Sequence, residues 1–391
     1  MKYAVADISS SSLSVIIAED SGDGIEVTGK EREPLSLLYY MDGDKLSRRG
    51  TEKLVSALSQ MKSRLKEAGV GRCWLIATAA LRHISDFGEV TEAVRAATGL
   101  EMNLIDGRAE AYCDYVANMR YSSEGGAVLV DLGGKSMEIC ALGKGKEGMT
   151  CFDFGLLDLY EKFADGKIQP DEDEAKKMGK YASSRFDKAG LPREGEYTDL
   201  VLVGQTCGAI YDMYAEFTDE PKSDGVKVMD RKKFGKLFRR LAHGADRSRL
   251  ILKTAPEKTH VILPAAAVIK KLIKRFDVER VTVSDRGVKE GYLALVLSGD
   301  ESGSYYDFDG KRSEGAPRGV ADDLPEKQTK KRGRPKKASA NAAGAAKKRG
   351  RPKKASANAA GAAKKRGRPK KASANAAGAP KKRGRPKKQI T

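Results

Sequence analysis

The sequence predicts an α/β protein made of two similar halves around a cleft, followed by a disordered basic tail. Strand-like runs alternate with amphipathic helical segments along the body. This alternation starts twice with a predicted hairpin that holds an aspartate, Asp7 in the first half and Asp131 in the second. The tail, residues 330–391, repeats one short unit rich in lysine and arginine. The repeated hairpin indicates a duplicated fold whose ligand site lies between the halves.

Residues 1–120 are expected to form the first domain. It starts with a hairpin whose two strands are joined by a run of serines, and apolar residues at helical spacing predict the helix that follows. The expected strands are residues 2–8, 13–19, 73–78 and a short one ending at 105, and the expected helices are residues 51–68, 87–98 and 107–119.

Residues 121–297 are expected to form the second domain. The expected strands are the hairpin 127–142 and residues 149–152, 200–203 and 280–284, with a glycine-rich turn at 204–208; the expected helices are 156–163, 171–186, 231–243, 261–276 and 287–297. Residues 298–329 are rich in Gly, Ser, Asp and Pro and are expected to form a linker to the tail.

Charge is distributed unevenly between body and tail. The formal net charge is +19, but the tail holds 24 of the 73 Lys and Arg residues and none of the 54 Asp and Glu residues. The rest of the chain therefore has 49 basic and 54 acidic residues and is mildly acidic. Nucleic-acid binding is accordingly expected of the tail rather than of the body.

Cysteine usage and hydropathy predict the compartment. The five cysteines lie far apart, without a C-x-x-C or a histidine spacing that suits zinc, and are expected to be buried thiols in a reducing compartment. The N-terminus enters a strand directly, and no apolar run approaches transmembrane length. We therefore expect a soluble, cytoplasmic protein that associates with DNA in the nucleoid and has no membrane partner.

The stretch VLVDLGGKSMEI, residues 128–139, contains the GGKS of a nucleotide-binding P-loop without its context. A P-loop needs G-x-x-x-x-G-K-[ST], and Leu129 stands where the first glycine is required. Apolar residues on both sides of the glycines predict strand, turn, strand rather than strand, loop, helix. The P-loop interpretation therefore fails, and a hairpin that carries Asp131 remains as a candidate phosphate site.

Five motifs follow one another along the body. ADISSSSLS, ATAALR, LIDGRAEA, VDLGGKSMEI and VSDRGVKEGYL occur in this order between Asp7 and Gly291. They resemble D-I-G-S-N-S, A-T-x-A-x-R, I-S-G-x-E-E-A, D-I-G-G-G-S-T-E and S-x-x-G-x-R-E-G of the exopolyphosphatase and guanosine pentaphosphate phosphohydrolase (Ppx/GppA) family. The resemblance implies a duplicated actin-like (ribonuclease H-like) ATPase fold with two domains around a cleft.

The resemblance also implies a Mg²⁺-dependent phosphohydrolase that releases terminal phosphate from polyphosphate or a guanosine pentaphosphate-type alarmone. Glu110 is expected to activate the attacking water, and Mg²⁺ is expected to be held by Asp7, Asp131 and Glu138. The residues expected to bind phosphate are Arg82, Ser10, Ser12, Gly133, Gly134, Lys135 and Ser136. Because two-fold dimers are common among relatives, a homodimer is expected.

Each assignment has an ordinary structural alternative. Glu110 could be a first-turn helix carboxylate favoured by the helix dipole, Asp131 could cap a tight turn, and Arg82 could be a surface salt-bridge partner. The loops also depart from the family, since Ser9 and Lys135 stand where it has glycine. The alternative function is therefore a catalytically degenerate, DNA-binding regulatory protein that senses a phosphorylated ligand.

The tail unit KKRGRPKK occurs four times at a spacing of 17 residues. It resembles the AT-hook, whose Arg-Gly-Arg-Pro core lies in the minor groove of A·T-rich DNA, where a narrow groove concentrates negative potential that attracts arginine. The alternatives are a generic polycation and a segment that holds polyphosphate for the body. The residues expected to bind DNA are Arg332, Gly333, Arg334, Arg349, Gly350, Arg351, Arg366, Gly367, Arg368, Arg383, Gly384 and Arg385.

Overall fold

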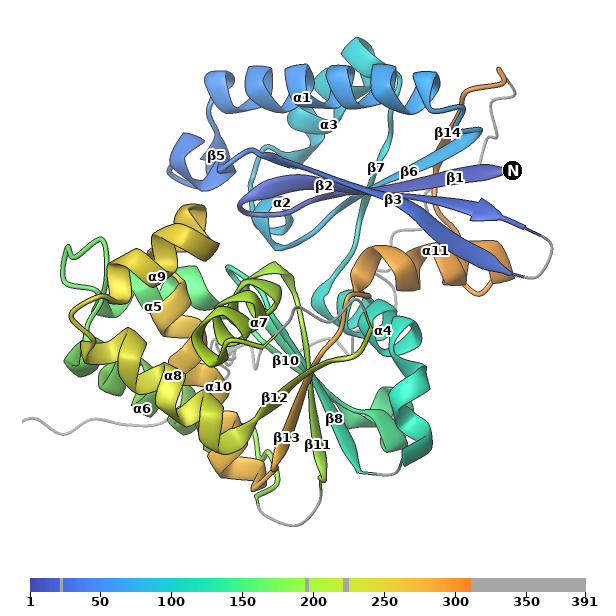
Figure 1. Ribbon diagram of the computed structural model, residues 1–391. Coiled ribbons are helices and arrows are strands. Elements are labelled where there is room, and N and C mark those ends of the chain that lie inside the picture. Colours follow the sequence, from blue (N-terminus) through green and yellow to red (C-terminus); the bar gives the residue numbers. More distant parts are fainter. Residues whose placement is uncertain (22–23, 125, 194–196, 221–224, 311–391) are drawn as a thin grey trace, which may run out of the picture. The chain divides into compact units, whose positions relative to one another are not determined.

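The computed structural model describes residues 1–21, 24–124, 126–193, 197–220 and 225–310. They form two α/β halves, each built on a sheet that begins with a β-hairpin (Figure 1). The predicted basic tail and residues 311–329 of the predicted linker lie outside the described residues.

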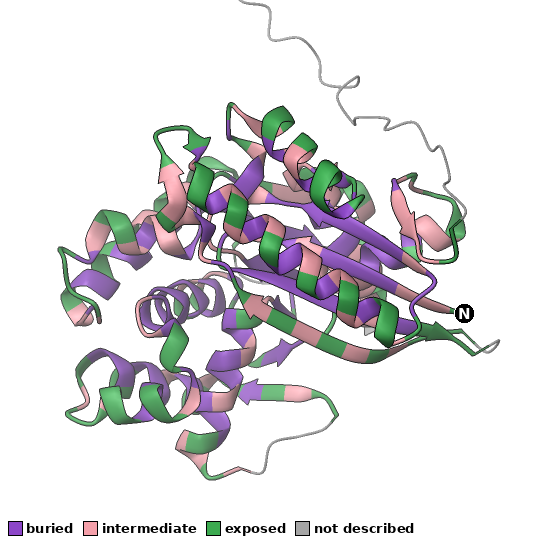
Figure 2. Cartoon of the chain, turned by 90° about the horizontal axis from the view of Figure 1, so that it is seen from above, coloured by how far each residue is buried: buried purple, intermediate pink, exposed green. Residues whose placement is uncertain are grey.

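The first sheet has the strand order β14-β6-β1-β2-β3, and β7 also pairs with β6. β1 is antiparallel to β2 and parallel to β6, so the β1–β2 turn lies at the same edge as the end of β6. The edge strand β3 alternates exposed and partly buried residues, whereas the inner strands are largely buried (Figure 2). The strands are β1 (Lys2–Ile8), β2 (Ser12–Asp20), β3 (Ile25–Pro34), β6 (Arg72–Ala77), β7 (Met102–Leu104) and β14 (Tyr305–Asp307).

The second sheet has the order β10-β9-β8-β11-β13-β12 and repeats this arrangement. Its hairpin strand β8 is antiparallel to β9 and parallel to β11, which in turn is parallel to β13. The shared arrangement confirms the predicted duplicated fold. The strands are β8 (Ala127–Leu132), β9 (Met137–Ala141), β10 (Met149–Phe152), β11 (Asp199–Val203), β12 (Lys227–Asp230) and β13 (Arg280–Val283).

Helices cover both sheets. Alternate strand residues point to opposite faces, so the apolar side chains on each face need a helix to pack against. In the first half, α1 (Arg48–Glu67) and α3 (Phe87–Thr98) lie on one face. In the second half, a large core packs the sheet against α5 (Leu156–Phe163), α6 (Glu172–Lys188), α7 (Gln205–Thr218), α8 (Arg231–His243), α9 (Arg247–Thr254) and α10 (Ile262–Phe276). The short elements are η1 (Leu37–Tyr40), β4 (Met41–Asp42), β5 (Lys45–Leu46), α2 (Ala79–Arg82), η2 (Met119–Glu124), η3 (Leu142–Gly148) and η4 (Pro256–Lys258).

Helix α4 (Gly107–Ala117) packs against both sheets. Its Cys113 belongs to a cluster with Val5 of the first sheet, whereas its Ala111 belongs to a cluster with Leu129 of the second. Helix α11 (Val288–Ser298) lies against α4, and a Cβ on Gly291 would stand 1.8 Å from the Cys113 carbonyl oxygen. Only glycine permits this approach, which fixes α4 between the two halves.

Three features differ from the sequence-based expectations. The segment 204–208, expected as a turn, begins helix α7, because Cys207 and later residues of this helix pack into the core. The linker predicted from residue 298 is wrong in its first part, since Tyr305–Asp307 form β14 and pair with β6. Helix α11, predicted to belong to the second domain, packs through Tyr292 and Leu293 with Val5 of the first sheet.

Two further expectations concern the surface. Four of the five cysteines are buried as predicted, but Cys151 is exposed. Within the described part of the chain, no helix combines the length and the apolar character that spanning a bilayer requires.

Candidate active site

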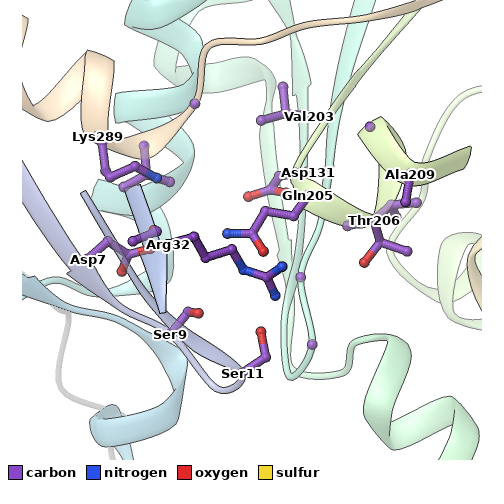
Figure 3. Close-up of a pocket in the computed structure, with 18 of the residues that line it drawn as sticks. Asp7, Ser9, Ser11, Arg32, Asp131, Val203, Gln205, Thr206, Ala209 and Lys289 are labelled. Atoms are coloured by element: carbon purple, nitrogen blue, oxygen red, sulfur yellow. The ribbon is translucent and has the colours of Figure 1, made fainter. Parts of the chain in front are cut away.

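A cleft of about 560 Å³ lies where the two hairpin turns face each other. Its walls include the Ser9–Ser11 turn of the first half and the Gly133–Ser136 turn of the second. The start of α7 and the segment before α11 complete the lining. Figure 3 shows Asp7 and Ser9 on one side, Asp131 and Gln205 on the other, and the Arg32 side chain reaching between them.

Three acidic side chains converge beside this cleft. One carboxylate oxygen from each of Glu110, Asp131 and Glu138 lies within 4.8 Å of the others. Helix α4 supplies Glu110 from its first turn, while strands β8 and β9 pair Asp131 directly with Glu138. All three are buried, with relative exposures of 8%, 9% and 1%. The strand register and the position of α4 therefore create the cluster.

Arg82 is the cationic partner of Glu110. Its Nη2 donates to Glu110 Oε2 at 2.5 Å, and its Nε donates to the Ile105 carbonyl oxygen at 3.1 Å. The pair is largely withdrawn from solvent, with side-chain exposures of 16% and 10%. The sequence-level alternative of a surface salt bridge is therefore wrong, because α2 turns Arg82 inward after β6.

The three carboxylates of the cluster have one cationic side chain, Arg82, as an ion-pair partner among the described residues. Burial raises the pKa of Glu110, Asp131 and Glu138, and the charges of neighbouring carboxylates add to the rise, whereas a hydrogen bond with Asp114 lowers the pKa of Asp131. Arg82 opposes the rise in the pKa of Glu110. Both oxygens of Glu138 are buried without a hydrogen-bond donor among the described residues. Oxygen ligands with no donor of their own are what a hard divalent cation of the Mg²⁺ type coordinates, so the residues fit such an ion.

Asp7, predicted as a metal ligand, is outside this group of three as far as the described residues go. It lines the cleft at the end of β1 and accepts a hydrogen bond of 3.4 Å from Thr78 Oγ1. Burial raises the pKa of Asp7, while the charge of Lys289 lowers it.

The first turn is closed by its own serines. Ser9 Oγ lies 3.0 Å from the Ser12 carbonyl oxygen, and Ser9 N donates to the same oxygen at 2.9 Å. Ser10 lines the cleft, as expected of a phosphate-binding residue. Ser12 is fully buried, its hydroxyl lies 3.3 Å from Ser9 Oγ, and it is not among the described residues that line the cleft.

The second turn is held by the N-terminus of α5. Leu156 N donates to Gly133 O at 3.0 Å, and Leu157 N donates to Gly134 O at 2.8 Å. A Cβ on Gly155 would stand 2.4 Å from the Gly134 carbonyl carbon, so this packing requires glycine. With both carbonyls bound, Gly133 and Gly134 are held in the lining of the cleft, and their binding of phosphate stays a prediction.

Lys135 lines the cleft, but its ammonium is bound elsewhere. Its Nζ lies 3.0 Å from Asp158 Oδ1 and 2.9 Å from Glu161 Oε2, both on α5. Ser136, its neighbour, also lines the cleft and is buried. The positive charge expected beside a phosphate chain is therefore already paired with two carboxylates.

The structure adds residues that the sequence reasoning missed. Asp114 is fully buried, and neither of its oxygens accepts a hydrogen bond from a described residue. It lies four positions after Glu110, a helical spacing that could have placed it on the same face. Lys258 lines the cleft with 7% exposure, and no motif pointed to it. Lys289 could have been found, because it occupies the arginine position of S-x-x-G-x-R-E-G.

Comparisons with known proteins bear on the family. The model described as the Ppx/GppA phosphatase family matches residues 15–298. The AT hook motif matches the tail four times, at residues 329–340, 346–357, 363–374 and 380–391. The tail thus carries four AT-hook motifs, whose structure lies outside the described residues.

Two curated relatives share segments of the body. A guanosine-5'-triphosphate,3'-diphosphate pyrophosphatase of Pseudoalteromonas translucida is 28% identical over 165 residues, which cover 41% of this chain and 33% of that protein. Exopolyphosphatase 1 of Mycobacterium tuberculosis is 26% identical over 143 residues, 36% of this chain and 42% of that protein. The matched segments thus span less than half the length of these relatives.

Two solved structures share the fold. An exopolyphosphatase from Cytophaga hutchinsonii superimposes with a TM-score of 0.68 at 19% identity and covers 78% of this chain and all of that one. The Ppx/GppA family member of Aquifex aeolicus gives a TM-score of 0.64 at 24% identity over 77% of this chain and 99% of that one. None of these comparisons tests the expected homodimer, which stays a prediction. The family model spans most of the body, including the second hairpin and the three acids of the cluster, and the chain belongs to the Ppx/GppA phosphatase family.

Proposed function

We propose that this protein is a Mg²⁺-dependent phosphohydrolase that releases terminal phosphate from polyphosphate or from a guanosine pentaphosphate-type alarmone. The observation that carries the proposal is the buried group Glu110, Asp131 and Glu138, with Arg82 on Glu110, beside a cleft lined by two glycine- and serine-rich turns. The two substrates are those named for relatives of the body.

In this proposal Glu110 is the general base. Water attacks the terminal phosphorus, a new P–O bond forms, and the bridging P–O bond breaks so that its oxygen leaves on the shortened chain. Glu110 accepts the proton of the water, and Arg82 holds the Glu110 carboxylate in position. The raised pKa of Glu110, caused by burial, makes it a stronger base than an exposed carboxylate.

The remaining cleft residues bind and orient the phosphates. The backbone N–H groups of Gly133 and Gly134 and the hydroxyl groups of Ser10 and Ser136 are the proposed donors. Mg²⁺ would be held by Asp131 and Glu138, with Glu110 close by, and would neutralise charge on the phosphate oxygens.

The tail is proposed to tether the enzyme to A·T-rich DNA. Its support is the four AT-hook motifs and the concentration of positive charge in residues 330–391. Motifs joined by short spacers gain apparent affinity, because the first contact raises the local concentration of the others.

The first test is phosphate release by the full-length protein from long-chain polyphosphate and from guanosine pentaphosphate, each with Mg²⁺ and with chelator. We expect metal-dependent release from at least one substrate. Glu110→Gln should lower the rate by about 10²- to 10⁴-fold, because it removes the base and leaves the binding groups in place. Glu101→Gln, an exposed position, is the matched control and should keep full activity.

The result also separates the enzyme from a phosphate sensor. Lys135 supports the sensor alternative, because its charge is paired with α5 rather than available to a phosphate. Tight binding of a substrate by folded protein, without release of phosphate, would contradict the enzyme proposal. Unchanged activity in Glu110→Gln would contradict the assignment of the base.

A further inference from the structure

A second cavity, of about 590 Å³, adjoins the cleft at the acidic cluster. The two spaces share Ala79, Lys135 and Ser136 in their linings. The Arg82–Glu110 ion pair spans the boundary, since Glu110 lines the cleft and Arg82 lines the second cavity. Glu138 also faces the second cavity. The candidate reaction centre therefore lies between the two spaces.

The two cavities differ in the charges they offer to a phosphate chain. The cleft has more cations in its lining, Lys30, Arg32, Lys135, Lys227, Lys258, Arg286 and Lys289, beside eight carboxylates, Asp7, Glu31, Glu110, Asp131, Asp212, Glu257, Asp285 and Glu290. The second cavity is lined by apolar residues such as Leu38, Met41 and Ile84, and its cations include Arg82 and Arg108. A long polyanion is better held in the cleft, because the cleft combines more cations with the glycine- and serine-rich turns that can donate to successive phosphates.

The acids of the second cavity are mostly bound to other groups. Asp106 caps α4 by accepting from Arg108 N at 2.9 Å, Asp158 pairs with Lys135, and Asp153 pairs with Arg185. Arg82 keeps one nitrogen available, because Nε and Nη2 have acceptors whereas Nη1 has none among the described residues. A single phosphate leaving the reaction centre can therefore be received by Arg82 Nη1.

The geometry of the reaction indicates which reactant and which product the second cavity can take. In phosphoryl transfer the attacking and leaving oxygens lie roughly in line on opposite sides of the phosphorus. If the chain lies in the cleft, its leaving oxygen points into the cleft and the attacking water comes from the opposite side. The orthophosphate that forms then carries the former water oxygen on the side of the second cavity.

We propose that the second cavity admits the attacking water and releases orthophosphate, while the shortened chain stays in the cleft. The inference rests on the proposed function and adds a separate product path to it. Its mechanistic consequence is processive hydrolysis, since the product need not pass the chain to leave.

Cys151 offers a way to narrow this path. It lines the second cavity, it is the exposed one of the five cysteines, and its Sγ lies 3.3 Å from the Gly107 carbonyl oxygen. Cys151→Trp should leave the first turnover nearly unchanged and slow steady-state turnover about tenfold, because release becomes limiting. The expected record is a burst of one phosphate per enzyme, followed by slow release.

Two variants control for this change. Cys151→Ser keeps the cavity open, and Glu101→Trp adds the same bulk at an exposed position that lines neither cavity. Both should keep wild-type steady-state turnover and processive product lengths. Equal loss of the first turnover and of steady-state turnover in Cys151→Trp, or no loss in either, would overturn the proposal.

A binding measurement keeps the inference testable if no substrate is hydrolysed. Inorganic phosphate should slow alkylation of Cys151 in the wild-type protein about threefold at twice its dissociation constant, because one third of the sites are then free. A methylene-bridged triphosphate should bind without this protection. Protection by the triphosphate, or none by phosphate, would overturn the product path, whereas absent hydrolysis with intact protection would count only against the proposed function.

Discussion

Lys258 is a buried cation in the cleft wall, and its charge depends on pH in the physiological range. Burial, and after it the charge of the Arg32 guanidinium, lower the pKa of Lys258 to about 8, although Glu257 opposes both. No described residue accepts a hydrogen bond from its ammonium, so a phosphate oxygen is a suitable partner. A bound phosphate would stabilise the charged form and raise its pKa.

We therefore expect KM for a polyphosphate substrate to rise as pH increases through about 8, because the lysine loses its proton in the free enzyme. Lys258→Met should raise KM about tenfold at pH 7, a loss of about 1.4 kcal/mol in binding, and should flatten its pH dependence. Steady-state kinetics between pH 7 and 9 check this. A KM profile that keeps the same slope in Lys258→Met would rule out Lys258 as the titrating group.

Asp114 is a second buried residue whose contribution to the free energy of unfolding depends on pH. Burial raises its pKa well above the usual value, and the Asp131 carboxylate adds to the rise. An unfolded chain ionises this carboxyl above pH ~4, whereas the folded chain keeps it protonated, so folding must take up a proton. The contribution of Asp114 to stability therefore falls as pH rises above the unfolded pKa.

Asp114→Asn should remove this pH-dependent loss of stability, because the amide has nearly the same shape as the carboxyl and does not ionise. Thermal unfolding in chelator should show the variant gaining more in Tm at pH 8 than at pH 5, with Glu101→Gln as an exposed control. A gain that is equal at both pH values would mean that Asp114 is ionised in the folded protein.

At the scale of elements, the start of α7 fixes the position of Asp131. Gly204 has a φ of 98°, and a Cβ there would stand 2.7 Å from Asp131 Oδ1. Gly204→Ala should lower the free energy of unfolding by about 1–3 kcal/mol and displace Asp131, with a matching loss of phosphate release. Denaturant unfolding and phosphate release measure the two effects.

Gly235→Ala on α8 is the matched control. A Cβ at Gly235 meets nothing within 4 Å, and the glycine lies inside a helix. Alanine there should raise stability by up to about 1 kcal/mol and leave phosphate release unchanged. If Gly204→Ala changed neither stability nor phosphate release more than Gly235→Ala does, the close approach of Gly204 to Asp131 would not be needed for activity.

The elements that the sequence predicts are those whose own residues carry a periodic apolar pattern. The hairpins β1–β2 and β8–β9 and helices such as α1 and α10 lie where the pattern places them. Strand β3 was missed because it is an edge strand with an exposed face, and β14 because it has three residues and pairs with the distant β6. Helix α7 was missed because its glycine-rich start resembles a turn, and core packing overrides this local preference.

In the candidate site, too, the residues that belong to a local motif were predictable, and those that depend on the packing of distant elements were not. The motif residues Glu110, Asp131 and Arg82 were predictable, because a family resemblance pointed to each. The pairing of Lys135 with Asp158 and Glu161 was not, since it depends on where α5 lies. Lys258 reaches the cleft from a short 3₁₀ helix, a position that no local pattern reports.

At the scale of the whole molecule, charge divides the chain into a mildly acidic body and a strongly basic tail. The tail holds four AT-hook motifs. Its arginines and lysines are expected to act differently, because the Arg-Gly-Arg core enters the minor groove whereas the flanking lysines bind phosphates. Two full-length variants that each remove eight positive charges separate these roles. The arginine variant replaces Arg332, Arg334, Arg349, Arg351, Arg366, Arg368, Arg383 and Arg385 by alanine, and the lysine variant replaces Lys336, Lys337, Lys353, Lys354, Lys370, Lys371, Lys387 and Lys388.

The arginine variant should lose the preference for A·T-rich over G·C-rich duplex. The lysine variant should keep that preference but bind both duplexes more weakly, with a salt slope reduced by about 0.9 for each DNA phosphate that the tail no longer neutralises. Fluorescence anisotropy over a range of salt concentrations measures both quantities, and phosphate release by the two variants tests whether the tail affects the body. If both variants lose the same affinity on both duplexes, the tail is a generic polycation. If polyphosphate then competes as strongly as A·T-rich DNA, its ligand is the substrate of the body.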